Sequence, residues 1–194
     1  GKTKYSENAG LLALRQAIAR YLARTEGLSY DPASQIVVTP GAMGALFLAL
    51  KVLLNPGDEV IVNEPCWTNY IQQIRMCGGV PVSVKTDAQR GFDLDVSAVA
   101  EAITSKTKAI ILNSPCNPTG AVASAETLSQ LAKLAQERDL VVLADEVYKH
   151  ILFDGRTYTG FATLPGMKER TLVIDSLSKT YAMTGWRIGY AAGP

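Results

Sequence analysis

The chain has too little histidine and cysteine to support a zinc site or a disulfide framework. Its 194 residues include one histidine and three cysteines, an odd number without CxxC spacing. We therefore expect no metal, and we interpret Cys66, Cys77 and Cys116 as reduced thiols of a cytoplasmic protein. The sequence also lacks a signal peptide and any apolar run long enough to cross a membrane.

An excess of either charge is also missing. The net charge is +1, which indicates neither a nucleic-acid surface nor an acidic tail. Hydrophobic residues make up 47% and charged residues 19%, as is typical of a soluble globular protein. Without repeats, low-complexity segments or linkers, residues 1–194 are expected to form one large domain. Since the sequence starts at Gly1 without an initiator methionine, we interpret it as a piece of a longer protein.

What the sequence does contain is an alternation of apolar, strand-like runs with helical stripes. The strand-like runs are continuous, which predicts strands covered on both faces. Pro81 favours an edge position for its strand, and Asp95 and Ser124 are candidate helix caps. These patterns predict an α/β fold, with an open, mainly parallel sheet of about seven strands and helices on both faces. The predicted strands are 36–39, 59–62, 80–84, 109–112, 140–144, 171–175 and 187–192, and the predicted helices are 10–24, 41–54, a segment ending near 76, 96–104 and 125–138.

The most informative side chain is Lys179, in a loop of small residues directly after the strand predicted at 171–175. Open α/β sheets place their ligands at the carboxyl ends of strands. A partly desolvated lysine is a nucleophile, and a nearby guanidinium such as that of Arg187 binds phosphate. An imine-forming amine beside a phosphate anchor indicates pyridoxal 5'-phosphate. The alternative is a surface lysine and a structural arginine.

Asp145 and Asn117 follow two other apolar strands and are expected at the same rim. A carboxylate at the end of a buried strand is costly unless it is paired, and the ring nitrogen of the cofactor is a suitable partner for Asp145. Asn117 and Tyr148 are candidate donors to the phenolic oxygen of the ring. A helix cap or a salt bridge would also explain Asp145, and an ordinary turn would explain Asn117.

The start of the helix predicted at 41–54 is a candidate phosphate site, because free backbone N–H groups and the helix dipole attract anions there. Its first residues are Gly41, Ala42 and Met43, and the hydroxyls of Ser176 and Ser178 are further candidate donors. Trp67 is a candidate for stacking on an aromatic ring, with core packing as the alternative. For His150 we expect a structural role.

With these residues assembled, the chain resembles the class I/II aminotransferases of the aspartate aminotransferase fold, which are fold type I pyridoxal phosphate enzymes. The resemblance covers essentially the whole chain and is closest to bacterial members acting on aspartate, aromatic or related amino acids. Three motifs carry it, and they are Asn117-Pro118-Thr119-Gly120, Ala144-Asp145-Glu146-Val147-Tyr148, and Ser176-Leu177-Ser178-Lys179 with Met183-Thr184-Gly185-Trp186-Arg187-Ile188-Gly189.

The resemblance implies a role for each of these residues. Lys179 carries the cofactor as an imine and shuttles the substrate proton, and Tyr5 reaches the phosphate of a neighbouring subunit in a homodimer. Segment 187–192 is implied to be antiparallel in the sheet, and the Glu64–Pro65 and Asn117–Pro118 bonds are implied to be cis. The other implied contacts are Asp145 to the ring nitrogen, Asn117 and Tyr148 to the phenolic oxygen, Trp67 to the ring face, and Gly41, Ala42, Met43, Ser176 and Arg187 around the phosphate.

Two departures from the family pattern limit the prediction. Many members have a polar side chain where this chain has Met43, and the family's carboxy-terminal domain and amino-terminal segment are absent. We therefore expect a cofactor-binding large domain of an enzyme that moves an amino group between an amino acid and a 2-oxo acid. The alternatives are a carbon–sulfur lyase or synthase on the same scaffold, and a non-catalytic regulatory module that binds the cofactor.

Overall fold

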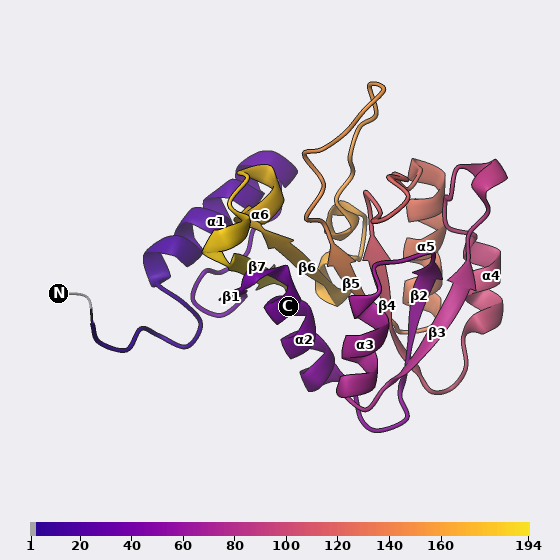
Figure 1. The fold of residues 1–194 in the computed structure, drawn as a ribbon, viewed down its shortest axis with the longest axis horizontal. Coiled ribbons are helices and arrows are strands. Elements are labelled where there is room, and N and C mark those ends of the chain that lie inside the picture. The colour runs from indigo at the N-terminus through magenta and orange to yellow at the C-terminus, as the bar shows by residue number, and fades with distance from the viewer. Residues whose placement is uncertain (1–2) are drawn as a thin grey trace.

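A computed structural model describes residues 3–194 and shows one seven-stranded sheet with helices on both faces (Figure 1). The strands lie in the order β1-β7-β6-β5-β4-β2-β3. The strands are β1 Ile36–Pro40, β2 Glu59–Glu64, β3 Val80–Lys85, β4 Thr107–Asn113, β5 Val141–Asp145, β6 Thr171–Ser176 and β7 Ile188–Ala192. The α-helices are α1 Leu12–Glu26, α2 Gly41–Leu53, α3 Asn69–Met76, α4 Val96–Ala102, α5 Ala125–Glu137 and α6 Leu177–Thr180.

The sheet is parallel except at β7, which pairs antiparallel with both β6 and β1. The neighbouring pairs from β3 to β6 are all parallel. This confirms the predicted α/β fold and the antiparallel last strand. The strand that contains Pro81 is at one edge of the sheet, as predicted.

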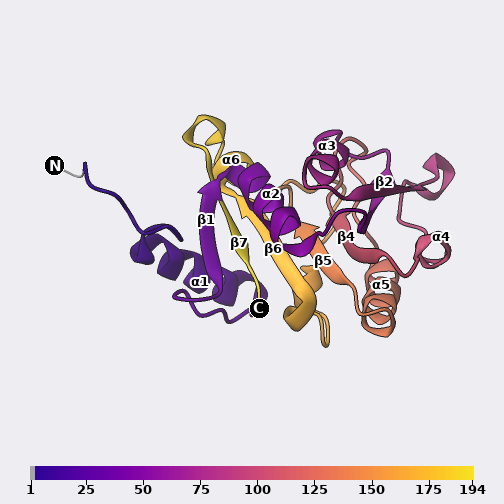
Figure 2. The same ribbon diagram turned by 90° about the horizontal axis from the view of Figure 1, so that it is seen from below.

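The two faces of the sheet bury different sets of side chains because successive strand residues point to opposite faces. On β4, Ile110 and Leu112 pack with α4 and α5, whereas Ile111 packs with α2 and α3. Helix α1 packs over Val173 and Tyr190 on the same face as α5. Figure 2 shows this division, with α2 and α3 on one side of the sheet and α1 and α5 on the other. The runs are apolar throughout because both faces are covered.

Local signals in the sequence account for several element ends. The Asp95 carboxylate accepts from two backbone N–H groups at the start of α4, and Ser124 caps α5, as predicted. Gly27 ends α1 with a φ of 70°, in the left-handed region that favours glycine. The Glu64–Pro65 and Asn117–Pro118 bonds are cis as predicted, and Ser114–Pro115, for which we had no prediction, is also cis.

One local prediction was wrong. The segment from Leu177 to Thr180, expected as a loop, forms the short helix α6. The Ser176 side chain accepts from the Ser178 N–H and so caps the first turn of α6. A run of small residues is compatible with such a capped turn and with an open loop, so the sequence does not distinguish the two. Within residues 3–194, no helix combines the length and apolar character needed to cross a bilayer.

Candidate active site

A cavity of about 270 Å³ opens where the carboxyl ends of β4, β5 and β6 meet the start of α2. Residues from these separate segments meet there because parallel strands end at the same rim of the sheet. The structure places every predicted site residue in its wall except Gly41 and Tyr5. The lining residues are Ala42, Met43, Trp67, Tyr70, Asn117, Asp145, Val147, Tyr148, Ser176, Ser178, Lys179, Thr184 and Arg187.

One end of the cavity is suited to a phosphate. Helix α2 begins there without a side-chain cap and without an acidic residue in its first turn, so its first N–H groups are available to a ligand. The Arg187 guanidinium lies against Gly41, where the Cβ of any larger residue would overlap it. Arg187 Nη1 donates to the Thr184 carbonyl at 2.8 Å, which fixes the orientation of the side chain. Gly41, though not in the wall, therefore leaves the space that the arginine occupies.

The phosphate end is held in place by close backbone packing. A Cβ on Gly189 of β7 would overlap the backbone of Gly41 and Ala42, so β7 and the start of α2 are in direct contact. Thr39 Oγ1 donates to the Gly41 carbonyl at 2.8 Å across the turn. Ser176, which is buried, ends β6 in the cavity wall. The resulting cradle consists of backbone donors, one hydroxyl and one guanidinium.

The opposite wall contains a buried carboxylate. Asp145 is only 5% exposed, and no lysine, arginine or histidine of residues 3–194 forms a salt bridge with it. Burial raises its pKa to about 6, although hydrogen bonds from Tyr70 and the Val147 N–H work in the other direction. Tyr70 Oη donates to Asp145 Oδ2 at 2.6 Å. A buried carboxylate of this kind fits a cationic N–H donor such as a protonated pyridine ring.

Two further donors are set side by side by Asn113. Its Nδ2 donates to the Asp145 carbonyl at 3.0 Å, and its Oδ1 accepts from the Asn117 N–H at 2.8 Å. This side chain therefore joins the loop after β4 to the loop after β5. The Asn117 amide donates in turn to the Tyr148 hydroxyl at 3.3 Å. The two polar groups predicted to contact the same ring oxygen are thus adjacent.

Lys179 reaches the cavity from α6, and its Nζ is 5.6 Å from the centre of the Tyr148 ring. The residue is exposed, so the partial desolvation expected from the sequence is not observed. The reason is its place on a one-turn helix at the rim, where the amine faces an open cavity rather than the core. The amine is accessible to an aldehyde.

Of the two aromatic residues that meet in the cavity wall, Trp67 was predicted from the sequence and Tyr70 was not. The two rings meet edge to face with centroids 5.5 Å apart, and Trp67 is half-buried. The only sequence signal for Tyr70 is its place one helical turn after Trp67, which also fits ordinary core packing. Val147 and Thr184 are the other lining residues that were not singled out.

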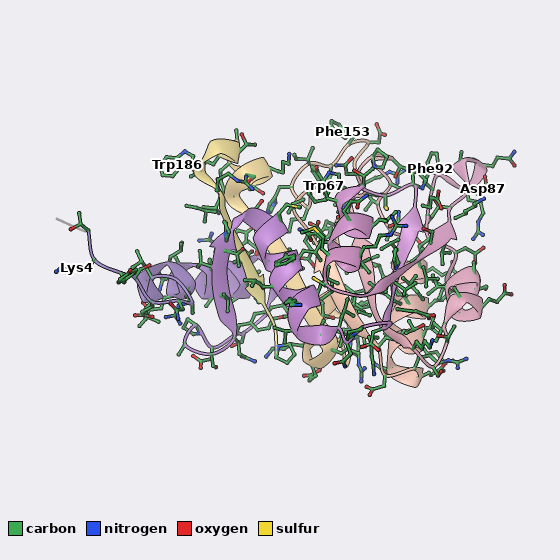
Figure 3. All side chains as sticks on the ribbon, turned by 60° about the horizontal axis from the view of Figure 1, so that its bottom comes forward. Lys4, Trp67, Asp87, Phe92, Phe153 and Trp186 are labelled. Atoms are coloured by element: carbon green, nitrogen blue, oxygen red, sulfur yellow. The ribbon has the colours of Figure 1, made fainter. Side chains whose placement is uncertain are left out.

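Tyr5 and His150 lie outside the cavity. Tyr5 is fully exposed in the amino-terminal tail, and Figure 3 shows its neighbour Lys4 at the end of the molecule far from Trp67. The His150 ring contacts the Tyr21 hydroxyl on α1. Residues 3–194 contain no group of three or more histidine, cysteine, aspartate or glutamate side chains that could hold a metal ion.

Fold and cavity together define an α/β domain in which a lysine, a phosphate cradle and a buried carboxylate line the same cavity. The chain belongs to the aminotransferase class I and II family, whose match covers residues 1–194. It is 48% identical to a putative aminotransferase, YugH, of Bacillus subtilis and 46% identical to an aspartate/prephenate aminotransferase of Thermus thermophilus. Both alignments cover 100% of this chain, with 50% of the first relative and 49% of the second.

The fold is the same as in solved structures of this family. An aromatic aminotransferase from Pyrococcus horikoshii superposes with a TM-score of 0.96 at 43% identity, covering 99% of this chain and 51% of that one. The chain thus spans about half the length of the curated relatives it matches.

Proposed function

We propose that residues 1–194 are the cofactor-binding large domain of a pyridoxal phosphate-dependent aminotransferase. The whole enzyme would move an amino group from an amino acid to a 2-oxo acid. The observation that carries the proposal is the single cavity that unites an accessible lysine, a buried carboxylate without a cation and a phosphate cradle. The names of the relatives favour amino-group transfer over a carbon–sulfur lyase or a regulatory module.

The phosphate would be held by Arg187, the Ser176 hydroxyl and the free backbone N–H groups of Ala42 and Met43. A guanidinium offers a planar, permanently charged pair of donors, and the helix start adds oriented dipoles. Because the backbone supplies these contacts, the apolar side chain of Met43 is compatible with the site. Its sulfur instead accepts a contact from Gln73 on α3 at 3.6 Å.

The ring would lie between the phosphate cradle and Asp145. The Asp145 carboxylate would accept from the protonated ring nitrogen, and Asn117 and Tyr148 would donate to the phenolic oxygen. Trp67 would cover one face of the ring. Tyr70 favours the ionised form of Asp145 by donating to it, because a hydrogen bond to the charged form lowers the pKa of a carboxyl.

When bound, pyridoxal phosphate supplies an aldehyde that condenses with amines and a ring that withdraws electrons from the substrate's alpha carbon. Lys179 Nζ would hold the cofactor and would accept the alpha proton of the substrate as a general base. The Tyr148 ring centre lies 5.6 Å from Nζ. Asp145 would pair with the protonated ring nitrogen and stabilise its charge.

The experiment is borohydride reduction of the chain mixed with pyridoxal phosphate, followed by peptide mapping. The pyridoxyl group should be found on Lys179, and Lys179→Ala should abolish it. Lys133→Ala, which changes an exposed lysine on α5, is the matched control and should label as the parent chain does. Labelling of another lysine in the unmodified chain would refute the site.

Amino-group transfer by this chain alone, with aspartate, alanine and aromatic amino acids, should be near background. We expect this because the chain spans only about half the length of its curated relatives.

We also propose that the enzyme is a cytoplasmic homodimer in which Tyr5 reaches the phosphate of the neighbouring copy. Tyr5 is 106% exposed, and Leu11 and Leu12, which follow it, are exposed apolar residues. Helix α2 also leaves Leu48 and Val52 exposed on the face away from the sheet. Light scattering of the whole enzyme should show a dimer, and a monomer at working concentrations would contradict the proposal. The unpaired Cys66, Cys77 and Cys116 support the cytoplasmic location.

A further inference from the structure

Behind the cavity, on the α1 side of the sheet, four ionisable side chains form a buried charge cluster. Its members are Glu26, Glu146, Lys149 and Asp175. Lys149 Nζ is 2.7 Å from Glu26 Oε1, 2.9 Å from Asp175 Oδ2 and 3.6 Å from Glu146 Oε2. All four side chains are at most 7% exposed. The cluster is as buried as the apolar core around it.

The cluster contains three carboxyl groups and one ammonium, so Lys149 is decisive for its charge balance. Every salt bridge that residues 3–194 make to these carboxylates involves Lys149. Asp175 has two more donors, the Tyr190 hydroxyl at 2.9 Å and the Ser176 N–H at 2.6 Å. The Tyr158 hydroxyl lies beside the Glu146 carboxyl, whereas Glu26 Oε2 has no hydrogen-bond partner among residues 3–194. Removing the lysine would leave three buried carboxyl groups without a cation, which is strongly unfavourable.

The members of the cluster alternate in sequence with the cavity residues. Glu146 follows Asp145, Lys149 follows Tyr148, and Asp175 precedes Ser176. On the rim that they share, Asp145, Tyr148 and Ser176 line the cavity, whereas Glu146, Lys149 and Asp175 meet in the cluster. The cavity wall and the cluster are therefore two sides of the same short backbone segments.

The backbone between them is a tight turn fastened to β6. The Glu146 N–H donates to the Ile174 carbonyl at 2.9 Å, and the Lys149 N–H donates to the Glu146 carbonyl at 3.0 Å. The Lys149 ammonium then spans from this turn to Asp175 at the end of β6 and to Glu26 at the end of α1. Gly160 leaves room for the Glu26 carboxylate, because a Cβ there would lie 2.5 Å from its Oε2.

We propose that Lys149 is a positioning residue of the active site. Its ion pairs to Glu26 and Asp175 fix the turn that carries Asp145 and Tyr148 against the strand end that carries Ser176. The proposal rests on the proposed function, since it concerns the geometry with which the cavity receives pyridoxal phosphate. Lys149 itself contacts neither the cofactor nor the substrate.

The test compares Lys149→Met with Leu131→Ala, a core truncation on α5 that lowers stability without touching the cavity. The dissociation constant for pyridoxal phosphate is measured at a temperature where circular dichroism shows each variant folded. Lys149→Met should bind at least about tenfold more weakly, whereas Leu131→Ala should stay within about twofold of the parent chain. Asp175→Asn, which keeps the shape and an acceptor for Tyr190, should fold and bind about three- to tenfold more weakly.

Hydrogen exchange of the cofactor-free chain gives a second readout. Lys149→Met and Asp175→Asn should speed exchange in residues 145–149 and at the end of β6, more than Leu131→Ala does. If Lys149→Met does not fold, the affinity and the hydrogen exchange of Asp175→Asn provide the test. Parent-like affinity and exchange in the folded cluster variants would overturn the proposal and leave the proposed function intact. A parent chain that binds no pyridoxal phosphate would contradict the proposed function, and the exchange data would still test the role of Lys149.

Discussion

Lys179 and Lys149 lie on opposite sides of the same backbone segments and have opposite surroundings. Lys179 is exposed, faces the cavity, and forms no salt bridge within the described part of the chain. Lys149 is 3% exposed and is surrounded by three carboxyl groups. Burial alone would lower the pKa of Lys149, but Asp175, Glu146 and Glu26 together raise it well above its usual value.

The difference shows how the same backbone segments can carry a reactive amine on one side and a fixed, charged amine on the other. An amine that reacts must be accessible and must be able to lose its proton, so carboxylates beside it would be a disadvantage. An amine that holds loops together must stay charged, which the carboxylates around Lys149 ensure. Substitutions on the cavity side should therefore change ligand binding, whereas substitutions in the cluster should also change folding stability.

The largest loss of cofactor affinity on the cavity side is expected from a substitution at Arg187. Arg187→Ala should weaken pyridoxal phosphate binding by about 30- to 100-fold, since charge-assisted hydrogen bonds to phosphate contribute about 2–3 kcal/mol. The melting temperature of the cofactor-free chain should barely change, because the side chain is exposed. Arg138→Ala, an exposed arginine at the end of α5, is the control. An equal loss of affinity in both variants would show a general charge effect rather than a phosphate site.

A pH effect should distinguish the cluster from the cavity. Burial raises the pKa of Glu146 to about 8, against about 4.5 for an ordinary glutamate. The folded chain then holds a proton that the unfolded chain releases, so stability is highest below the ordinary pKa and falls as the pH rises toward 8. Urea unfolding of the cofactor-free chain should show a loss of about 1–3 kcal/mol between pH 6 and pH 8. Glu146→Gln should flatten this slope. A stability that rises over this range would contradict the assignment.

A smaller effect is expected from Tyr70→Phe, which removes the donor to Asp145 and leaves the ring in place. The hydrogen bond lowers the pKa of Asp145, so its loss should move that pKa up from about 6. Cofactor affinity should fall about three- to tenfold near neutral pH and should decline at a higher pH than in the parent chain. The measurement is the dissociation constant as a function of pH. Unchanged affinity and an unchanged pH profile would show that Tyr70 does not act through Asp145.

Much of the fold and of the cavity could be predicted because both follow from local signals. Continuous apolar runs mark the parallel strands, and residues just after those runs, such as Asn117, Asp145 and Lys179, must meet at one rim. Tyr70 was missed because it reaches the cavity from inside a helix, where an aromatic residue at helical spacing is usually part of the core.

The buried charge cluster was missed for a different reason. The spacing of Glu146 and Lys149 is visible in the sequence, but it also fits an exposed helical pair. Glu26 and Asp175 join them only through the packing of α1 on the sheet and the pairing of β6 with β5. The exposure of Lys179 likewise depends on the short helix α6, which the run of small residues does not distinguish from a loop.

The pairing of β6 with β7 makes the order of residues in β6 as important as their identity. Asp175 lies opposite Tyr190, and Ser176 lies opposite Gly189. Because side chains alternate along a strand, a one-residue insertion or deletion in β6 would exchange the two faces. An insertion before Asp175 would move its carboxylate to the position of Ser176 in the phosphate cradle. A deletion would instead move the Ser176 hydroxyl to the position where Asp175 pairs with Lys149. A shift of β6 by a single position would therefore abolish the cofactor site and the buried ion pair together, even though every functional residue would still be present.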